Sequence, residues 1–282
     1  MFPNTRSHLT QGRGIAATLA VIFALGLGFS VTSAAGASNG RDQQTANPTI
    51  VFVHGGWADS SGWNQEITNL ERRSFPVIAP ANPLRDLASD TAYIRSVLQT
   101  ISGPIVLVGH SYGGAVITNA AVGVPNVKAL VYIAGFAPDR GESLLQLVTM
   151  NPGTLIGPAT LDTRPYPLAD GGTGTDLYLK KSAFHEAFAA DLPLKITDQM
   201  QATQRPFSNE AFVSLSGEPA WRTIPSWYLV STQDKAIPPV TQRFMAQRAH
   251  AIVAEVRASH VAMMSQPEET TRLILNAADS IR

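Results

Sequence analysis

The sequence predicts an α/β fold, a doubly wound and mostly parallel sheet with an inserted, mainly helical cap. Three observations lead to this prediction. Short apolar segments alternate with amphipathic helical segments, which is the pattern of a parallel sheet covered by helices. A Gly-x-Ser-x-Gly sequence, Gly109 to Gly113, directly follows one of the apolar segments. More than ninety residues without this alternation separate Ile133 from Trp227.

Six short apolar segments, rich in β-branched residues, predict the strands of the sheet. In chain order they are Thr49 to Val53, Pro76 to Ala79, Ile105 to Val108, Ala129 to Ile133, Trp227 to Val230 and Ala251 to Val256. Amphipathic spacing predicts the helices between and after them. These are roughly Gly62 to Arg72, Ser89 to Ile101, Tyr112 to Ala121, Pro239 to Arg248 and Pro267 to Ser280. Because helices alternate with the strands, we expect the strands to run parallel.

The long segment between the fourth and fifth predicted strands predicts a cap. Prolines and glycines mark loops in it, at Pro152, Pro158, Pro165, Pro167 and Gly171 to Gly174. Two stretches, Leu177 to Ala190 and Lys195 to Gln201, have a helical pattern. An unstructured loop of this length is uncommon in a compact domain. We therefore expect an inserted cap at about residues 141–222, above the carboxyl ends of the strands, where ligands bind in such sheets.

The first 37 residues have the three parts of a secretory signal peptide. Arg6 and Arg13 give a basic start, Gly14 to Phe29 is apolar, and Ala35 to Ala37 supplies small residues for cleavage. The apolar stretch is shorter than the ~20 residues that a spanning helix needs, and an uncleaved membrane anchor is the alternative. We expect cleavage near Ala37, a secreted or periplasmic location, and a mature domain of residues 38–282 without stable membrane insertion.

The composition excludes several classes of function. The chain has 21 basic and 21 acidic residues and no run of like charge, which argues against a nucleic-acid partner. It has no cysteine, so it forms no disulfide and depends on its core for stability. Metal-ligand spacings and phosphate-binding loops are absent from the sequence, so nothing in it implies a metal or a cofactor. No feature of the sequence predicts an oligomeric state.

Ser111 lies at the centre of the Gly-x-Ser-x-Gly sequence, between an apolar strand and a predicted helix. A serine on so sharp a turn takes up strained backbone angles that raise its hydroxyl above the sheet. Gly109 and Gly113, two positions to either side, let the strand and the helix approach closely. This context predicts that Ser111 is a nucleophile and not a bystander in a glycine-rich turn.

A serine hydroxyl needs a base, and the base needs an orienting carboxylate. In folds with this serine turn the chain order is Ser, then Asp or Glu, then His. Asp234 follows the fifth predicted strand and His260 follows the sixth, so both are expected at the same sheet edge as the serine. Asp139, after the fourth strand, is the alternative acid. We interpret His54 as a residue that organises its loop, with a second base as the alternative.

Acyl transfer also needs backbone N–H groups that bind the developing oxyanion. Tyr112, at the start of a helix, is predicted to supply one of them. Gly56 is predicted to supply the other, with Trp57 as the alternative. The candidate substrate-binding residues are Trp57, Phe136, Phe184 and His185. The alternative for the aromatic residues of the cap is that most of them form its core.

With the first strand and His54-Gly55-Gly56-Trp57, the serine turn, Asp234 and His260, the chain resembles the α/β-hydrolase superfamily over nearly all of residues 48–282. Within it, the chain is similar to the branch of small bacterial esterases, plant methyl esterases and plant hydroxynitrile lyases. The resemblance implies a triad of Ser111, Asp234 and His260, an oxyanion hole from Gly56 and Tyr112, and a lid inserted after the strand that follows the serine turn.

Two positions favour ester hydrolysis within this branch. Its lyases carry a lysine after the catalytic histidine and a threonine after the first-strand histidine, where this chain has Val261 and Gly55. The resemblance therefore implies a serine carboxylesterase that cleaves small to medium apolar or aromatic esters through an acyl-enzyme. The alternatives are a lactonase or amidase on the same triad, a lyase acting on cyanohydrins, and a binding protein without catalysis.

Overall fold

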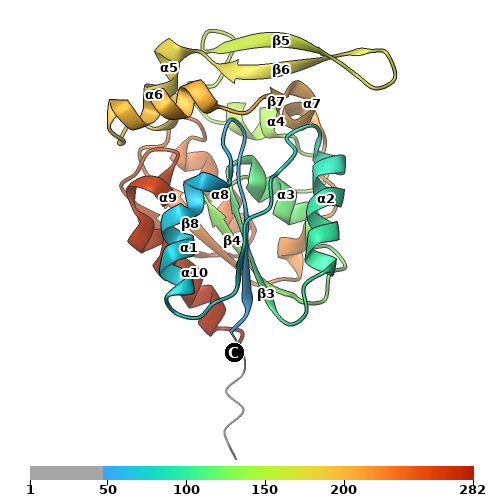
Figure 1. Ribbon diagram of the computed structural model, residues 1–282, viewed down its shortest axis with the longest axis vertical. Helices are drawn as coiled ribbons and strands as arrows, with labels where there is room; N and C mark the ends of the chain where they lie inside the picture. Colours follow the sequence, from blue (N-terminus) through green and yellow to red (C-terminus); the bar gives the residue numbers. More distant parts are fainter. Residues whose placement is uncertain (1–46) are drawn as a thin grey trace, which may run out of the picture. The chain divides into compact units, whose positions relative to one another are not determined.

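A computed structural model describes residues 47–282, and the expected signal peptide lies outside the described residues. Six strands form one sheet in the order β2-β1-β3-β4-β8-β9, with every neighbouring pair parallel (Figure 1). The strands are β1 (Thr49–Val53), β2 (Val77–Ile78), β3 (Ile105–His110), β4 (Val127–Ile133), β8 (Ser226–Ser231) and β9 (Ile252–Val256). The predicted α/β fold class is confirmed.

Helices flank this sheet, with α1 and α10 on one side and α2 and α3 on the other in Figure 1. Their bounds are α1 (Asn64–Glu71, after the 3-10 turn η1, Ser60–Trp63), α2 (Leu87–Gln99), α3 (Tyr112–Ala120), α8 (Pro239–Arg248), α9 (Ala262–Ser265) and α10 (Pro267–Asp279). The five predicted helices are found within two residues of their expected ends. Within residues 47–282, no helix is long and apolar enough to cross a membrane.

The middle of the sheet is buried on both faces, as its apolar composition predicts. Every residue of β1, β3 and β8 is buried, and only Lys128 of β4 is exposed. The edge strand β9 differs, because Ile252 and Val253 are exposed in it. An edge strand has a neighbour on one side only, so its side chains are less completely covered. The core therefore lies around the central strands, which end at the cap.

The segment between β4 and β8 forms the cap, which lies across one end of the sheet (Figure 1). It contains α4 (Leu144–Thr149), α5 (Lys181–Phe188), α6 (Leu194–Thr203), α7 (Asn209–Val213) and η2 (Ala220–Arg222). It also contains a small antiparallel sheet of β5 (Leu161–Pro167), β6 (Thr173–Leu179) and β7 (Phe207–Ser208). Helix α6 matches the predicted helix at Lys195 to Gln201.

The β5-β6 hairpin corrects two expectations within the cap. Leu177 was expected in a helix but pairs with Thr163 inside β6, and α5 begins only at Lys181. Pro165 and Pro167, expected in a loop, lie within β5, and Gly174, also expected in a loop, lies within β6. Because β5 is an edge strand that pairs only with β6, the missing N–H of a proline is tolerated there.

Two side chains tie the cap to the loops at the strand ends. The Trp57 indole Nε1 donates a hydrogen bond of 2.9 Å to the Leu177 carbonyl in β6. The Arg85 guanidinium lies 2.9 Å from the Asp176 carboxylate and donates to the Pro206 carbonyl at 3.0 Å. These contacts hold the cap over the loop that follows β1 and over the start of α2.

Glu66 is a fully buried carboxyl group on α1. Within residues 47–282, neither of its oxygens has a hydrogen-bond partner in another residue. Burial raises its pKa from 4.5 to about 8, and the nearby charge of Glu268 adds to the effect. Between these two pH values the folded chain holds a proton that the unfolded chain releases, so the free energy of unfolding falls as the pH rises.

We therefore predict that Glu66→Gln stabilises the protein selectively at high pH. At about pH 4 the Glu66 carboxyl is protonated in the folded wild-type protein and mostly protonated in the unfolded one, so urea unfolding is expected to give similar free energies for the two proteins. At pH 9 the wild-type carboxyl must ionise in an apolar site, so the variant is expected to be the more stable. An equal difference at both pH values would contradict this account.

Candidate active site

Ser111 lies in the sharp turn between β3 and α3 and has the strained backbone that its sequence context predicts. Its φ is 52° and its ψ is −125°, a conformation that is uncommon for a residue with a side chain. A Cβ added to Gly113 would lie 2.1 Å from the Val53 carbonyl oxygen, and one added to Gly109 would lie 2.6 Å from the Gly113 oxygen. Glycine at both positions therefore permits the close packing that fixes the turn.

Asp234 and His260 form a buried pair at the carboxyl ends of the next two strands. Asp234 Oδ2 lies 2.7 Å from His260 Nδ1, and both residues are at most 3% exposed. Because an ionised carboxylate only accepts hydrogen bonds, Nδ1 carries the proton and Nε2 is left as the basic nitrogen. The other acid considered, Asp139, instead pairs with Arg222 at 2.6 Å.

The carboxylate of Asp234 is oriented by three further donors. Its Oδ1 accepts the backbone N–H groups of Ala236 and Ile237 at 2.7 and 2.9 Å. Its Oδ2 accepts the Gln242 side-chain amide at 2.8 Å. The amide oxygen of Gln242 in turn accepts the Ser231 N–H at 3.0 Å. Gln242 on α8 thus connects the end of β8 to the acid, a role that no local pattern indicates.

One pocket is lined by Ser111 and His260 together with Gly56 and Tyr112. We name it the inner pocket. The hydrogen bonds of residues 47–282 do not include one from the Ser111 hydroxyl to His260. Such bonds in serine hydrolases are often long without substrate and tighten in the complex.

The two backbone N–H groups expected to bind an oxyanion both lie at this pocket. Tyr112 is the first residue of α3, so its N–H precedes the hydrogen bonds of the helix. Gly56 lies in the loop after β1 and lines the same pocket. A Cβ on Gly56 would lie 3.0 Å from the Phe207 ring, so the cap packs directly on this loop.

His54 organises the loop that carries Gly56. Its Nε2 accepts the Asn82 backbone N–H at 2.9 Å, and its Nδ1 donates to the Gly55 carbonyl at 3.0 Å. The Asn82 side chain returns a 3.0 Å hydrogen bond to the His54 carbonyl. Burial lowers the pKa of His54 to about 4, so the ring is neutral near pH 7. This geometry fits the interpretation of His54 as a loop residue and not a second base.

Two buried side chains, Asp90 and His110, hold residues of the site in place, and the sequence did not predict either role. The Tyr112 hydroxyl donates to Asp90 Oδ2 at 2.7 Å, and the Arg85 N–H donates to the same carboxyl group. His110 Nε2 lies 3.0 Å from the His260 carbonyl, and because a carbonyl only accepts, Nε2 carries the proton. Burial lowers the pKa of His110 well below its usual value, so a neutral ring holds the backbone of His260.

The four candidate substrate-binding residues divide into two pairs. Trp57 and Phe136 line the inner pocket. Phe184 is not among the residues that line it and packs on Phe188 at 5.2 Å between ring centroids, while His185 lies 3.2 Å from the Leu192 carbonyl. Phe188, one turn further along α5, has its ring 5.1 Å from that of His260. The cap helix therefore approaches the site with a different aromatic residue from the one expected.

Comparison with known proteins identifies the family. Residues 50–273 match the model of the "Alpha/beta hydrolase family", and the chain belongs to this family. A relative named "Alpha/beta hydrolase nvfD", from Aspergillus novofumigatus, is 28% identical over 82% of this chain and 96% of its own length.

Two further comparisons concern named esterases and hydrolases. A "Pyrethroid hydrolase" from Sphingobium wenxiniae is 27% identical over 82% of this chain and 88% of its own length. The crystal structure of polyneuridine aldehyde esterase superposes with a TM-score of 0.70 at 20% identity, over 82% of this chain and 98% of that one. The structural likeness agrees with the fold derived above.

The serine turn leads to a prediction about stability. Gly113→Ala places a Cβ 2.1 Å from the Val53 oxygen, and backbone must move to admit it. We expect a loss of about 1–3 kcal/mol in the free energy of unfolding, together with lower activity.

Gly62→Ala is the control for this prediction, because its Cβ would make an ordinary 3.4 Å contact with Met263 Cε. We expect it to change stability by less than about 0.5 kcal/mol. Equal urea midpoints for the two alanine variants would show that the tight packing at Gly113 is not needed.

Proposed function

We propose that this protein is a serine carboxylesterase in which Ser111 is the nucleophile, His260 the general base and Asp234 the orienting acid. The observation that carries the proposal is the buried 2.7 Å pair of His260 and Asp234 on the pocket that Ser111 lines. The names of related proteins, which include "Pyrethroid hydrolase" and "Putative methylesterase 11", support an ester substrate.

The proposed reaction has two halves, acylation and deacylation, and in each of them His260 first accepts a proton and then returns it. His260 Nε2 accepts the Ser111 hydroxyl proton while the oxygen attacks the ester carbonyl. The N–H groups of Gly56 and Tyr112 bind the resulting oxyanion. The tetrahedral intermediate collapses as His260 returns the proton to the departing alcohol oxygen. Water then attacks the acyl-enzyme with His260 as base, releasing the acid and restoring Ser111.

The inner pocket supports small to medium apolar or aromatic substrates. Apart from Gly56, Tyr112 and the reacting groups Ser111 and His260, the described residues that line it are Trp57, Phe136, Leu144, Val148, Ile156, Phe207, Phe212, Ala236 and Ile237. Among these residues there is no charged side chain. An ionic group placed there would lose its hydration without a partner. Ser111, His260 and the two N–H groups could act on a lactone or an amide carbonyl in the same way, so a lactonase and an amidase are variants of the proposal.

The surroundings of Ser111 support hydrolysis over cyanohydrin cleavage. A Cβ added to Gly55 would lie 2.6 Å from the Cβ of Ser111, so a threonine side chain does not fit there without displacing the nucleophile. Val261, beside His260, is fully buried and uncharged. A departing cyanide ion would therefore meet no positive charge from either position.

Ser111→Ala tests the nucleophile directly. Without the hydroxyl no acyl-enzyme forms, and we expect hydrolysis of p-nitrophenyl butanoate and labelling by a fluorophosphonate probe to be lost. Ser96→Ala, an exposed serine on α2, is the control and is expected to keep both. Wild-type turnover in Ser111→Ala would refute the assignment.

We also propose that the protein is exported and that its N-terminal segment is removed near Ala37. When the full-length chain is expressed in a bacterium with a secretion pathway, we expect it outside the cytoplasm. Mass spectrometry should give a mature chain that begins near Ser38. A chain of full mass in the cytoplasmic fraction would contradict export, and one of full mass in the membrane fraction would indicate an uncleaved anchor.

A further inference from the structure

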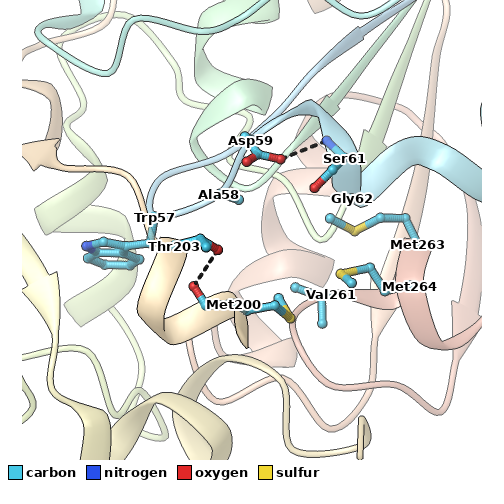
Figure 2. A pocket seen from close by; sticks show the side chains of 10 residues that line it. All are labelled: Trp57, Ala58, Asp59, Ser61, Gly62, Met200, Thr203, Val261, Met263 and Met264. Atoms are coloured by element: carbon cyan, nitrogen blue, oxygen red, sulfur yellow. Dashed lines mark hydrogen bonds between the residues drawn. The ribbon is translucent and has the colours of Figure 1, made fainter. Parts of the chain in front are cut away.

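A second pocket lies beside the inner pocket and is not used by the mechanism above. We name it the outer pocket. Three segments form its walls: the Trp57 to Gly62 segment, Met200 and Thr203 of α6 in the cap, and Val261 to Met264 (Figure 2). Resting on the proposed function, we propose that this pocket binds an uncharged aromatic group on the alcohol side of the ester.

The outer pocket adjoins the reacting groups through neighbours in the chain. Trp57 lines both pockets and directly follows Gly56. Val261 lines the outer pocket and directly follows His260. In Figure 2 the Trp57 ring is turned away from the methionines, and it packs against Phe188 and Phe207. The indole ring therefore lies among aromatic residues of the cap and does not fill the outer pocket.

The direction of proton transfer indicates which part of the ester lies there. His260 must return its proton to the alcohol oxygen, so the alcohol group has to leave along the side of the site that His260 occupies. The segment that follows His260 forms one wall of the outer pocket. The acyl group then binds in the inner pocket, against Phe136 and Phe207.

The side chains of the outer pocket favour an aromatic ligand. The sulfur atoms of Met200, Met263 and Met264 gather around one space in Figure 2. Thioethers are polarisable and make favourable contacts with aromatic rings, and the flexible methionine side chain adapts to the shape of the ligand. Met263 is 2% exposed, whereas Met200 and Met264 are partly exposed, so these two methionines offer most of the surface that an aromatic ring could contact.

Asp59 selects against negative charge in this pocket. It is the only charged side chain among the described residues that line it. Partial burial opposes its ionisation, but hydrogen bonds from the Ser61 side chain and N–H outweigh burial and hold the pKa below its ordinary value. Its carboxylate is therefore ionised at neutral pH and repels an anionic alcohol group.

Gly62 provides a variant that fills the outer pocket without straining the backbone. Its φ lies outside the left-handed region, and the nearest atom to an added Cβ is Met263 Cε at 3.4 Å. Gly62→Leu therefore directs its side chain toward the methionines. Thr203→Trp fills the pocket from the opposite wall, starting from an exposed residue. Gln65→Leu, exposed and outside the lining, is the matched control.

The first experiment compares two esters with the same acyl group, 2-naphthylmethyl butanoate and ethyl butanoate. We expect Gly62→Leu and Thr203→Trp each to lower the ratio of kcat/KM, naphthylmethyl over ethyl, by about tenfold, the effect of a poorly fitting apolar group. Gln65→Leu should leave the ratio unchanged. If Gly62→Leu does not fold, Thr203→Trp decides the question alone.

The outcomes separate this inference from the proposed function. An unchanged ratio in the filled variants, with ethyl butanoate still hydrolysed, would overturn the outer-pocket assignment and leave the esterase intact. The same variants are also tested on two methyl esters that differ only in the acyl group, methyl 2-naphthylacetate and methyl butanoate. If filling the pocket lowers the kcat/KM ratio of this pair instead, the acyl group binds in the outer pocket and the proposed orientation is wrong. No hydrolysis of any ester by the wild-type protein would overturn both.

Asp59→Asn gives a second, independent readout. Asparagine also serves as a helix N-cap, so the variant removes the charge and keeps the turn. We expect kcat/KM for 4-carboxybenzyl butanoate, relative to benzyl butanoate, to rise about threefold. The gain should shrink as salt is added. No change in this ratio would show that the alcohol group does not approach Asp59.

Discussion

The close packing of the β1 end against the start of α3 is the constraint on which the rest of the site depends. The Val53 carbonyl oxygen lies so close to the Gly113 Cα that no side chain larger than hydrogen fits at position 113. This contact holds the turn in which Ser111 has a φ of 52°. The same contact brings the loop after β1 beside Ser111. Both N–H groups proposed to bind the oxyanion are therefore placed by one piece of backbone packing.

Buried polar groups then fix the direction of each reacting side chain. Hydrogen bonds from neighbouring residues hold the loop of Gly56, the backbone of His260 and the carboxylate of Asp234, and burial keeps His54 and His110 neutral. His54 orders the loop of Gly56, His110 holds the backbone of His260, and Gln242 holds Asp234. A charged ring at either neighbouring histidine would oppose the positive charge that His260 acquires during the reaction. The surrounding network thus favours proton transfer to one ring only.

The cap divides the space above the strand ends into two pockets of different chemistry. Its aromatic residues close the inner pocket over Ser111, and α6 closes the outer pocket over Val261 and Met263. Because Trp57 and Arg85 tie the cap to the loops of the sheet, the two pockets depend on the same contacts. Substrate size and shape are therefore properties of the contact between cap and sheet.

The sequence by itself determined the order of strands and helices, the serine turn and the chain order of Ser111, Asp234 and His260. These features are local, since each rests on the spacing of apolar residues or on a glycine next to a strand. The tertiary structure decided what depends on contacts between distant segments. It placed Phe188 and not Phe184 beside His260. It also formed a hairpin where prolines indicated a loop, and the prolines are tolerated in β5 because an edge strand has a neighbour on one side only. It also brought Asp90 under Tyr112 and three methionines together, which no pattern along the chain records.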